Sequence, residues 1–136
     1  MTSSSGRQVA IVTGAGGAIG QAIIRKLAAD GLNLVLADIS LAPIEALASS
    51  LSLEPRQQAW CAQVDMGDVG SIGRMVDAVG ARFGRIDHVV NNAAVNHRGS
   101  LRDFDPGKWD HMMAVNLRGP AVLCQKTIPY WERQKG

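Results

Sequence analysis

Residues Val9–Gly20, which read VAIVTGAGGAIG, decide the fold of this chain. An apolar run leads directly into a glycine-rich turn, and the turn opens a segment whose apolar residues recur at helical spacing. Glycines let the backbone turn tightly, and the N-terminus of the following helix offers free N–H groups and the positive end of a dipole. The stretch therefore predicts a site for the pyrophosphate of a dinucleotide. The binding residues predicted within it are Gly14, Gly16, Gly17, Ile19 and Gly20.

An acidic residue after the next apolar run supports this interpretation. Asp38 follows Gly20 by eighteen positions and ends the run 33–38. A carboxylate there suits the two hydroxyls of an adenosine ribose, although it could also serve as a helix N-cap. A 2′-phosphate within ~4 Å of a carboxylate would be repelled by a few kcal/mol, and no arginine neighbours Asp38 in the sequence. We therefore expect the cofactor to be NAD rather than NADP.

Composition limits the class of protein. The 136 residues are 46% hydrophobic and 19% charged, as expected for one globular domain. A net charge of +2 without a Lys/Arg run argues against nucleic acid as a partner. Cys61 and Cys124 lack metal-ligand spacing, so no metal site is predicted. Residues 1–6 are expected to form a flexible tail before a domain at 7–136. Without a secretory signal or a membrane-spanning run, a cytoplasmic protein is expected.

Apolar runs alternate with helical patterns along the chain. We predict strands at 9–13, 33–38, 58–64 and 86–91, with helices at 17–30, from 41 to about 51, at 69–83 and from 106 to about 133. The last helix carries possible breaks at Gly119-Pro120 and at Pro129. This alternation predicts an α/β fold with a Rossmann-type parallel sheet, strand order 3-2-1-4, and helices on both faces. Because the fourth strand has no predicted outer partner, we expect a truncated domain.

Several motifs carry a resemblance to a known family. Residues 13–20 resemble the TGxxxGxG loop of the short-chain dehydrogenase/reductase family, and Asn91–Ala94 resemble its NNAG segment. Val115-Asn116-Leu117 resembles the family's VN segment, and 83–87 its usual lead-in to the fourth strand. Two positions depart from the pattern. Ala18 replaces a glycine, and its methyl is either tolerated or crowds the pyrophosphate, while Ala94 adds a methyl beside the expected nicotinamide.

The resemblance implies roles for individual residues. It implies hydride transfer between a small alcohol or carbonyl substrate and the nicotinamide, with Asn116 catalytic through a bound water and a local distortion of its helix. Asp65 would accept from the adenine amino group beside the Met66 backbone, or would instead cap the helix that starts near Asp68. Asn92 is expected against the cofactor ribose, and Asn91 is expected to tie strands together.

The family's catalytic serine and Tyr-x-x-x-Lys pair are not found in this sequence. Tyr130 is followed by Gln134 at the fourth position and by Lys135 at the fifth, so the pair would not share a helix face. We therefore expect the cofactor-binding part of an NAD-dependent oxidoreductase, inactive by itself. The alternatives are an inactive NAD-binding or interaction module and a remnant that does not fold.

Two further features have more than one interpretation. The last helix is apolar on more than one face, which predicts a homo-oligomer formed through it or simply an exposed apolar surface. His97 lies in the loop where substrate would enter, but a solvated histidine is the commoner case. His88 and His111 show no ligand spacing and are assigned no role.

Overall fold

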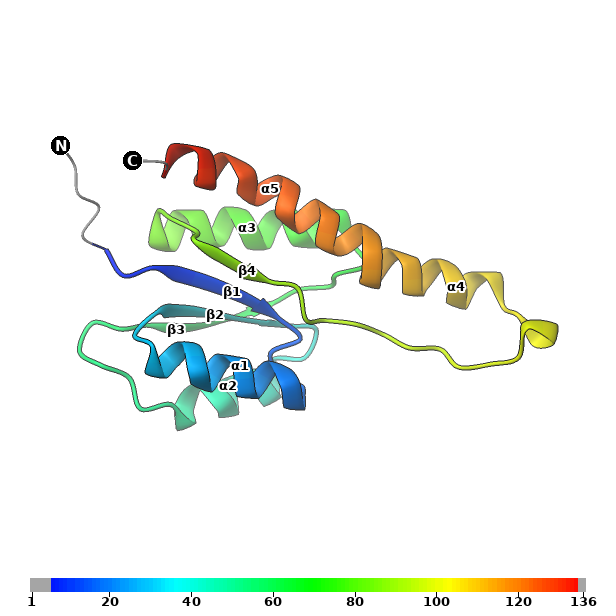
Figure 1. Ribbon diagram of the computed structural model, residues 1–136, viewed down its shortest axis with the longest axis horizontal. Helices are drawn as coiled ribbons and strands as arrows, with labels where there is room; N and C mark the ends of the chain where they lie inside the picture. The colour runs from blue at the N-terminus through cyan, green and yellow to red at the C-terminus, as the bar shows by residue number, and fades with distance from the viewer. Residues whose placement is uncertain (1–5, 135–136) are drawn as a thin grey trace.

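The computed structural model describes residues 6–134 and contains a four-stranded parallel sheet with helices on both faces (Figure 1). The strand order is β3-β2-β1-β4, as predicted. The elements in chain order are β1 (Val9–Thr13), α1 (Ala18–Ala29), β2 (Asn33–Asp38), α2 (Leu41–Ser50), β3 (Ala59–Gln63), α3 (Val69–Phe83), β4 (His88–Val90), the short helix η1 (Leu101–Asp103), α4 (Pro106–Met113), the π-helical turn η2 (Ala114–Arg118) and α5 (Gly119–Arg133).

The strands are aligned so that their carboxyl ends meet at one edge of the sheet. β1 pairs with β2 from Val9↔Asn33 to Thr13↔Ala37, and with β4 from Ala10↔His88 to Val12↔Val90. All pairs are parallel, as βαβ connections require. The glycine loop and Asp38, each at the end of a strand, are thereby brought to the same edge.

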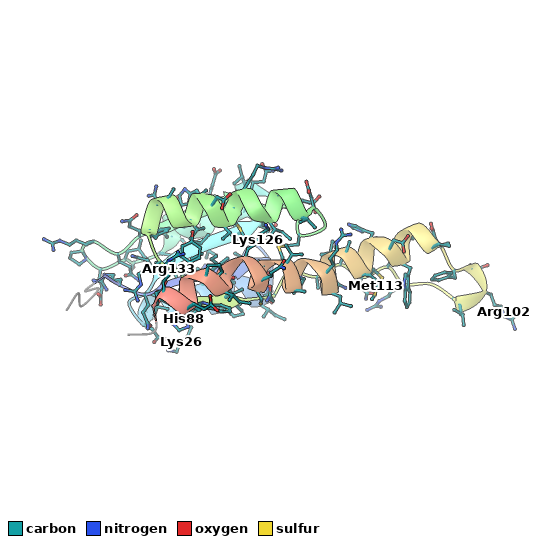
Figure 2. The ribbon with its side chains drawn as sticks, turned by 90° about the horizontal axis from the view of Figure 1, so that it is seen from above. Lys26, His88, Arg102, Met113, Lys126 and Arg133 are labelled. Atoms are coloured by element: carbon teal, nitrogen blue, oxygen red, sulfur yellow. The ribbon has the colours of Figure 1, made fainter. Side chains whose placement is uncertain are left out.

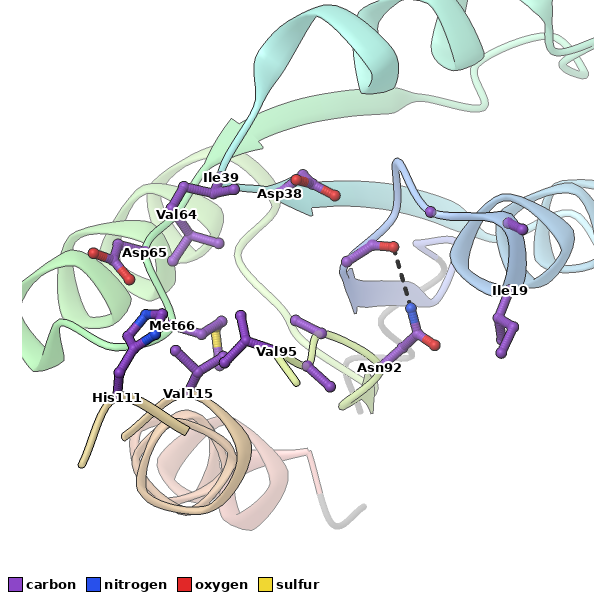
Figure 3. Close-up of a pocket in the computed structure, with 15 residues that line it drawn as sticks. Ile19, Asp38, Ile39, Val64, Asp65, Met66, Asn92, Val95, His111 and Val115 are labelled. Carbon is purple, nitrogen blue, oxygen red and sulfur yellow. Dashed lines mark hydrogen bonds between the residues drawn. The ribbon is translucent and has the colours of Figure 1, made fainter. Parts of the chain in front are cut away.

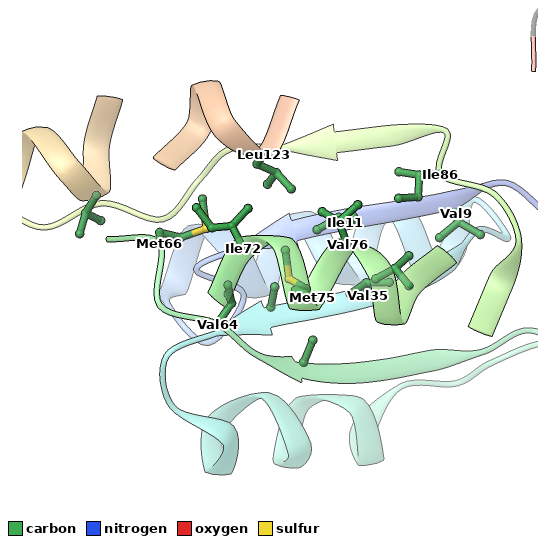
Figure 4. Packing of buried hydrophobic residues seen from close by; sticks show 14 residues of the cluster. Val9, Ile11, Val35, Val64, Met66, Ile72, Met75, Val76, Ile86 and Leu123 are labelled. Carbon is green, nitrogen blue, oxygen red and sulfur yellow. The ribbon is translucent and has the colours of Figure 1, made fainter. Parts of the chain in front are cut away.

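Each face of the sheet has its own apolar core. α3 and α5 cover one face, where Ile11 of β1, Ile72 of α3 and Leu123 of α5 are fully buried in one cluster (Figure 4). α1 and α2 cover the other face, where Ile24 and Ile44 pack against β1 and β2. Because both faces are covered, the inner strands are apolar at nearly every position, with β1 buried throughout.

The helical segment from Pro106 to Arg133 is irregular at a different place from the two predicted breaks. The irregularity falls at η2, residues 114–118, where the Gly119 N–H donates to the Ala114 carbonyl five residues back. Gly119-Pro120 instead begins α5, where the missing N–H of proline is tolerated. The predicted break at Pro129 is wrong, because α5 continues through it to Arg133.

Strand β4 is shorter than the predicted 86–91. Its N-terminal neighbour Ile86 is bonded through its backbone N–H and carbonyl to the Gln134 side chain at the end of α5. At the other end of the strand the chain turns, and the Asn92 N–H donates a hydrogen bond to the Val90 carbonyl at 3.1 Å. Strand β3 is likewise one residue shorter at each end than the predicted 58–64.

A partly buried ion pair fixes the chain just before β4. The Arg85 guanidinium donates to both carboxylate oxygens of Asp87, at 2.6 and 2.8 Å, and the Val9 N–H donates to the same carboxylate at 2.7 Å. Burial by itself raises the pKa of Asp87, but the bonds from Arg85 and Val9 outweigh it and hold the pKa below its usual value. The ionised pair therefore stabilises the junction of β1 and β4.

Residues 1–5 of the expected tail lie outside the described residues, whereas the Gly6 carbonyl accepts a hydrogen bond from Arg85. α4 and η1 reach beyond the sheet, with Met113 and Arg102 past the end of α3 (Figure 2). Within residues 6–134, no helix has the length and apolar character needed to span a membrane.

Candidate functional site

The glycine loop joins β1 to α1 through a left-handed residue. Gly14 has a φ of +63°, a conformation that L side chains rarely adopt. A Cβ there would lie 2.9 Å from the Ala93 Cα and 3.0 Å from the Asn92 Nδ2. Gly14 is therefore required for the close approach of the two loops that follow β1 and β4.

The start of α1 is placed directly against this loop. A Cβ on Gly20 would lie 2.8 Å from the Ala15 Cα, so only glycine permits this packing. Gly17 is the N-cap, and no side chain caps the helix there. The first N–H groups of α1 thus lack a capping side chain, as a helix end that binds an anion requires.

Asp38 is bonded to the glycine loop. Its Oδ2 accepts from the Gly16 N–H at 2.9 Å, and its Oδ1 accepts from the Ser40 N–H at 3.1 Å. Ser40, not Asp38, occupies the N-cap position of α2. The carboxylate thus lies between the end of β2 and the loop, where each oxygen retains capacity for a further hydrogen bond.

Asp65 does not cap helix α3, which was the alternative role predicted for it. The N-cap of α3 is Asp68, whose side chain accepts from the Gly70 N–H at 2.8 Å. Asp65 instead accepts from the Gly67 N–H at 2.8 Å, and Met66 beside it is buried. The capping alternative for Asp65 is therefore wrong.

The two asparagines after β4 differ in what their side chains contact. Asn92 ties the strands together: its Nδ2 donates to the carbonyls of Thr13 and Gly14, both at 3.1 Å. The side chain of Asn91 contacts the Cys124 Sγ at 3.5 Å instead. The prediction that Asn91 joins the strands is wrong. The chain turns after Val90, and this turn directs the side-chain amide of Asn92, not that of Asn91, toward β1. Asn92 also lines the cavity described below (Figure 3).

Asn116 lies within the π-helical turn η2, at the expected helix distortion. Both polar atoms of its side chain are bonded to the backbone of Val95. The residue four positions on is Pro120, which has no N–H, so the Asn116 carbonyl has no α-helical donor. This carbonyl is therefore open to a hydrogen bond from a water or a ligand.

A cavity of about 510 Å³ lies at the carboxyl edge of the sheet (Figure 3). Its lining residues are Gly14, Gly17, Ala18, Ile19, Asp38, Ile39, Val64, Asp65, Met66, Asn92, Ala93, Ala94, Val95, His111 and Val115. Among these described residues, none is Lys or Arg. Most of the predicted site residues meet here, but Gly16, Gly20 and Asn116 support the site from outside its lining.

His111 lines the cavity although the sequence predicted no role for it. Its Nδ1 lies 3.0 Å from the Nε2 of His97, so the loop after β4 meets α4. The two histidines are fourteen positions apart in the sequence, so no local spacing rule could have predicted this pair. Tyr130, in contrast, is half-buried and packs against the core beside α3, where its hydroxyl contacts Gly80. Tyr130 is not among the residues that line the cavity.

The comparison with known sequences decides the family. The profile of the short chain dehydrogenase family matches residues 8–136, nearly the whole chain. The chain belongs to the short-chain dehydrogenase family. The chain is 32% identical over 130 residues to a meso-2,3-butanediol dehydrogenase of Serratia marcescens. The aligned region covers 95% of this chain and 50% of that protein.

Solved structures of the family agree in fold. An alcohol dehydrogenase from the archaeon Thermococcus sibiricus, complexed with 5-hydroxy-NADP, superposes with a TM-score of 0.87 and 31% identity over 95% of this chain and 55% of its own. A 3-ketoacyl-(acyl-carrier-protein) reductase from Brucella melitensis, complexed with NADH, gives a TM-score of 0.84 and 28% identity over 93% of this chain and 51% of its own. This short-chain dehydrogenase chain spans about half the length of the relatives it matches.

Proposed function

We propose that this chain binds NAD in the cavity and supplies the cofactor-binding part of an oxidoreductase that acts on small alcohols or carbonyls. The observation that carries the proposal is the carboxylate of Asp38, held 2.9 Å from the Gly16 N–H at the entrance to α1. The names of the relatives, which include dehydrogenases of meso-2,3-butanediol and D-threitol, support the substrate class.

The residues present fit a dinucleotide. A volume of about 510 Å³ is typical of small-molecule sites. The uncapped start of α1 suits the pyrophosphate, Asp38 suits the adenosine ribose, and Asp65 with Met66 would hold the adenine. Asn92, whose Nδ2 is already bonded to β1, has its Oδ1 left to accept from a cofactor hydroxyl. When bound, the nicotinamide supplies the hydride acceptor or donor.

The charge of the lining favours NAD over NADP. Asp38 and Asp65 are the acidic residues of the described lining, and no Lys or Arg lies among those residues to pair with a 2′-phosphate. The solved relatives bind both kinds of cofactor, since one holds a 5-hydroxy-NADP and another NADH. The preference must therefore come from this pocket itself, where a phosphate beside Asp38 would be repelled.

Calorimetric titration of the 136-residue chain with NAD and then with NADP tests this proposal. We expect NAD to bind at least about tenfold more tightly, a difference of roughly 1.4 kcal/mol. Equal affinities would contradict the role of Asp38 at the ribose. Failure of both dinucleotides to bind a chain that is folded by circular dichroism would overturn the cofactor site itself.

A second candidate function is an NAD-binding module without chemistry. It is favoured by the position of Tyr130, whose hydroxyl contacts Gly80 of α3, and by the bonds that engage the Asn116 amide. We expect no measurable NAD reduction by this chain over a broad panel of alcohols, because the described lining of the cavity contains no tyrosine and no lysine to supply the proton transfer. Turnover by the pure chain would contradict that expectation. A serine and a Tyr-x-x-x-Lys pair in the continuation of the coding sequence would favour the oxidoreductase over the module.

The proposed setting is cytoplasmic, with a small-molecule substrate and no nucleic-acid or membrane partner. We also propose a homo-oligomer assembled through the last helix. Trp109, Met113 and Leu117 support it, because these large apolar residues are 54%, 40% and 61% exposed along α4 and η2. Exposed apolar residues on one helical stretch are typical of an interface.

A further inference from the structure

The loop after β3, residues 65–67, is held in place from two sides. On one side, the Ser71 hydroxyl of α3 accepts a hydrogen bond from the Asp65 N–H at 3.0 Å. On the other side, the guanidinium of Arg118, the last residue of η2, donates to the Gly67 carbonyl at 2.6 Å. Asp65 lines the cavity (Figure 3), whereas Arg118 is exposed and is not among the lining residues. The loop therefore connects Arg118 with the cavity.

Gly67 is bonded through both of its backbone polar groups. Its carbonyl accepts from Arg118, and its N–H donates to the Asp65 Oδ1 at 2.8 Å. A carboxylate accepts at two oxygens, so the Oδ2 of Asp65 has capacity left for a donor on a ligand. Arg118 thus holds the residue whose N–H sets the direction of the Asp65 carboxylate.

The helical turn that carries Arg118 packs closely against the same loop. A Cβ on Gly119 would lie 2.3 Å from the Met66 carbonyl oxygen, so only glycine permits this approach. One turn earlier, the buried Val115 places its Cγ2 3.4 Å from the position that a Cβ on Gly67 would take. Because η2 and the loop are in direct contact, the bond from Arg118 forms at a distance that the fold itself sets.

The direction of the Asp65 carboxylate decides which base it can accept from. Adenine carries an exocyclic amino group, which is a donor, where hypoxanthine carries an oxygen, which is an acceptor. A site built to accept from a ligand N–H rejects an analogue that lacks it, because the buried or fixed acceptor is left unpaired. We propose, on the basis of the cofactor site proposed above, that Arg118 is a positioning residue for the adenine half of the dinucleotide. It holds Gly67 and, through Gly67, directs the Asp65 carboxylate at the amino group of the base.

Calorimetric titration of the untagged 136-residue chain with NAD and with nicotinamide hypoxanthine dinucleotide tests this role. We expect the native chain to bind NAD about tenfold more tightly than the hypoxanthine analogue. Arg118→Ala should weaken NAD binding by roughly fivefold and change the affinity for the analogue little, so the ratio of the two affinities should fall toward one. Arg118→Lys, which keeps a cationic donor, should give an intermediate ratio. Arg102→Ala is the matched control, because Arg102 is exposed in η1, past the end of α3 (Figure 2).

Hydrogen exchange of the Gly67 amide, followed by NMR without any cofactor, gives an independent readout. This amide should exchange roughly fivefold faster in Arg118→Ala than in the native chain and in Arg102→Ala. Because Arg118 is exposed, the variants should keep the native circular dichroism spectrum.

Three results would overturn the role of Arg118 while leaving the NAD site in place. They are unchanged exchange of the Gly67 amide in Arg118→Ala, the same ratio of affinities in Arg118→Ala as in the native chain, and equal weakening of both dinucleotides, which a general loss of structure would produce. Failure of the native chain to bind either dinucleotide would instead overturn the cofactor site, and the role of Arg118 with it.

Discussion

Asn116 and Val95 form a closed pair of hydrogen bonds. The Val95 N–H donates to the Asn116 Oδ1 at 2.8 Å, and the Asn116 Nδ2 donates to the Val95 carbonyl at 2.8 Å. A side-chain amide offers both a donor and an acceptor, which a carboxylate or an apolar side chain cannot. The pair joins the loop after β4 to the π-helical turn η2, so two sides of the cavity are held at a fixed distance.

Asn116→Ala should loosen this loop. Each lost hydrogen bond contributes about 0.5–1.5 kcal/mol, so the amide hydrogen of Val95 should exchange with solvent roughly tenfold faster or more. Hydrogen exchange followed by NMR measures this directly. Asn91→Ala is the control, since Asn91 makes a weak contact with the Cys124 Sγ at 3.5 Å. Unchanged protection of Val95 in Asn116→Ala would show that packing alone holds the loop.

Gly14→Val should abolish dinucleotide binding. The left-handed backbone alone costs an L residue about 1–2 kcal/mol, and the new side chain would displace Asn92 and Ala93. We expect a lower urea midpoint and no heat of binding with NAD. Gly99→Val is the matched control, because a Cβ at Gly99 has no atom within 4 Å. A Gly14→Val chain that binds NAD normally would place the pyrophosphate elsewhere.

Substitutions at Asp38 should separate charge from geometry. Asp38→Asn keeps an oxygen that can accept from the Gly16 N–H but removes the charge, so the ratio of NAD to NADP affinity should fall toward one. Asp38→Ala should in addition weaken NAD binding, since the glycine loop loses its acceptor at 2.9 Å. Asp77→Asn, which removes an exposed charge on α3, is the control. An unchanged cofactor preference in Asp38→Asn would show that the charge of Asp38 does not set the preference.

The ion pair of Arg85 and Asp87 should make stability depend on acidity. Because the folded-state pKa of Asp87 is lowered, its contribution is fully present above the usual carboxyl value of about 3.9 and is lost as the pH falls through the lowered folded value. Asp87→Asn should reduce the free energy of unfolding at neutral pH by about 1–3 kcal/mol and flatten its decline in acid. Urea unfolding at several pH values measures both effects. If the free energy of unfolding declines in acid by the same amount in the native chain and in Asp87→Asn, other carboxylates cause the acid sensitivity.

Self-association should depend on the last helix. Leu117 is 61% exposed in η2, and Leu117→Glu should shift the chain toward monomer in light scattering. Leu101→Glu is the control, because Leu101 is 88% exposed in η1, outside that helix. A monomeric native chain at micromolar concentration, or a Leu101→Glu effect as large as that of Leu117→Glu, would contradict an interface on the last helix.

Local patterns predicted the elements and their order. The apolar run before the glycines predicted β1 at its observed bounds, and Gly84 ends α3 in the left-handed conformation at φ +70°. Asp38 and the glycine loop lie at the same edge, because the carboxyl ends of parallel strands necessarily meet there. These features depend on spacing within a few residues or on the topology of βαβ units, and both can be read from the sequence.

Contacts between distant segments were decided by the tertiary structure. Asn91 and Asn92 are neighbours in the sequence, and only the turn after Val90 determines which amide reaches β1. His97 and His111 meet because α4 runs beside the loop after β4. Gln134 bonds to the backbone of Ile86, forty-eight positions away in the sequence. Side-chain partners of this kind depend on the packing of whole elements, and no periodicity or local spacing encodes that packing.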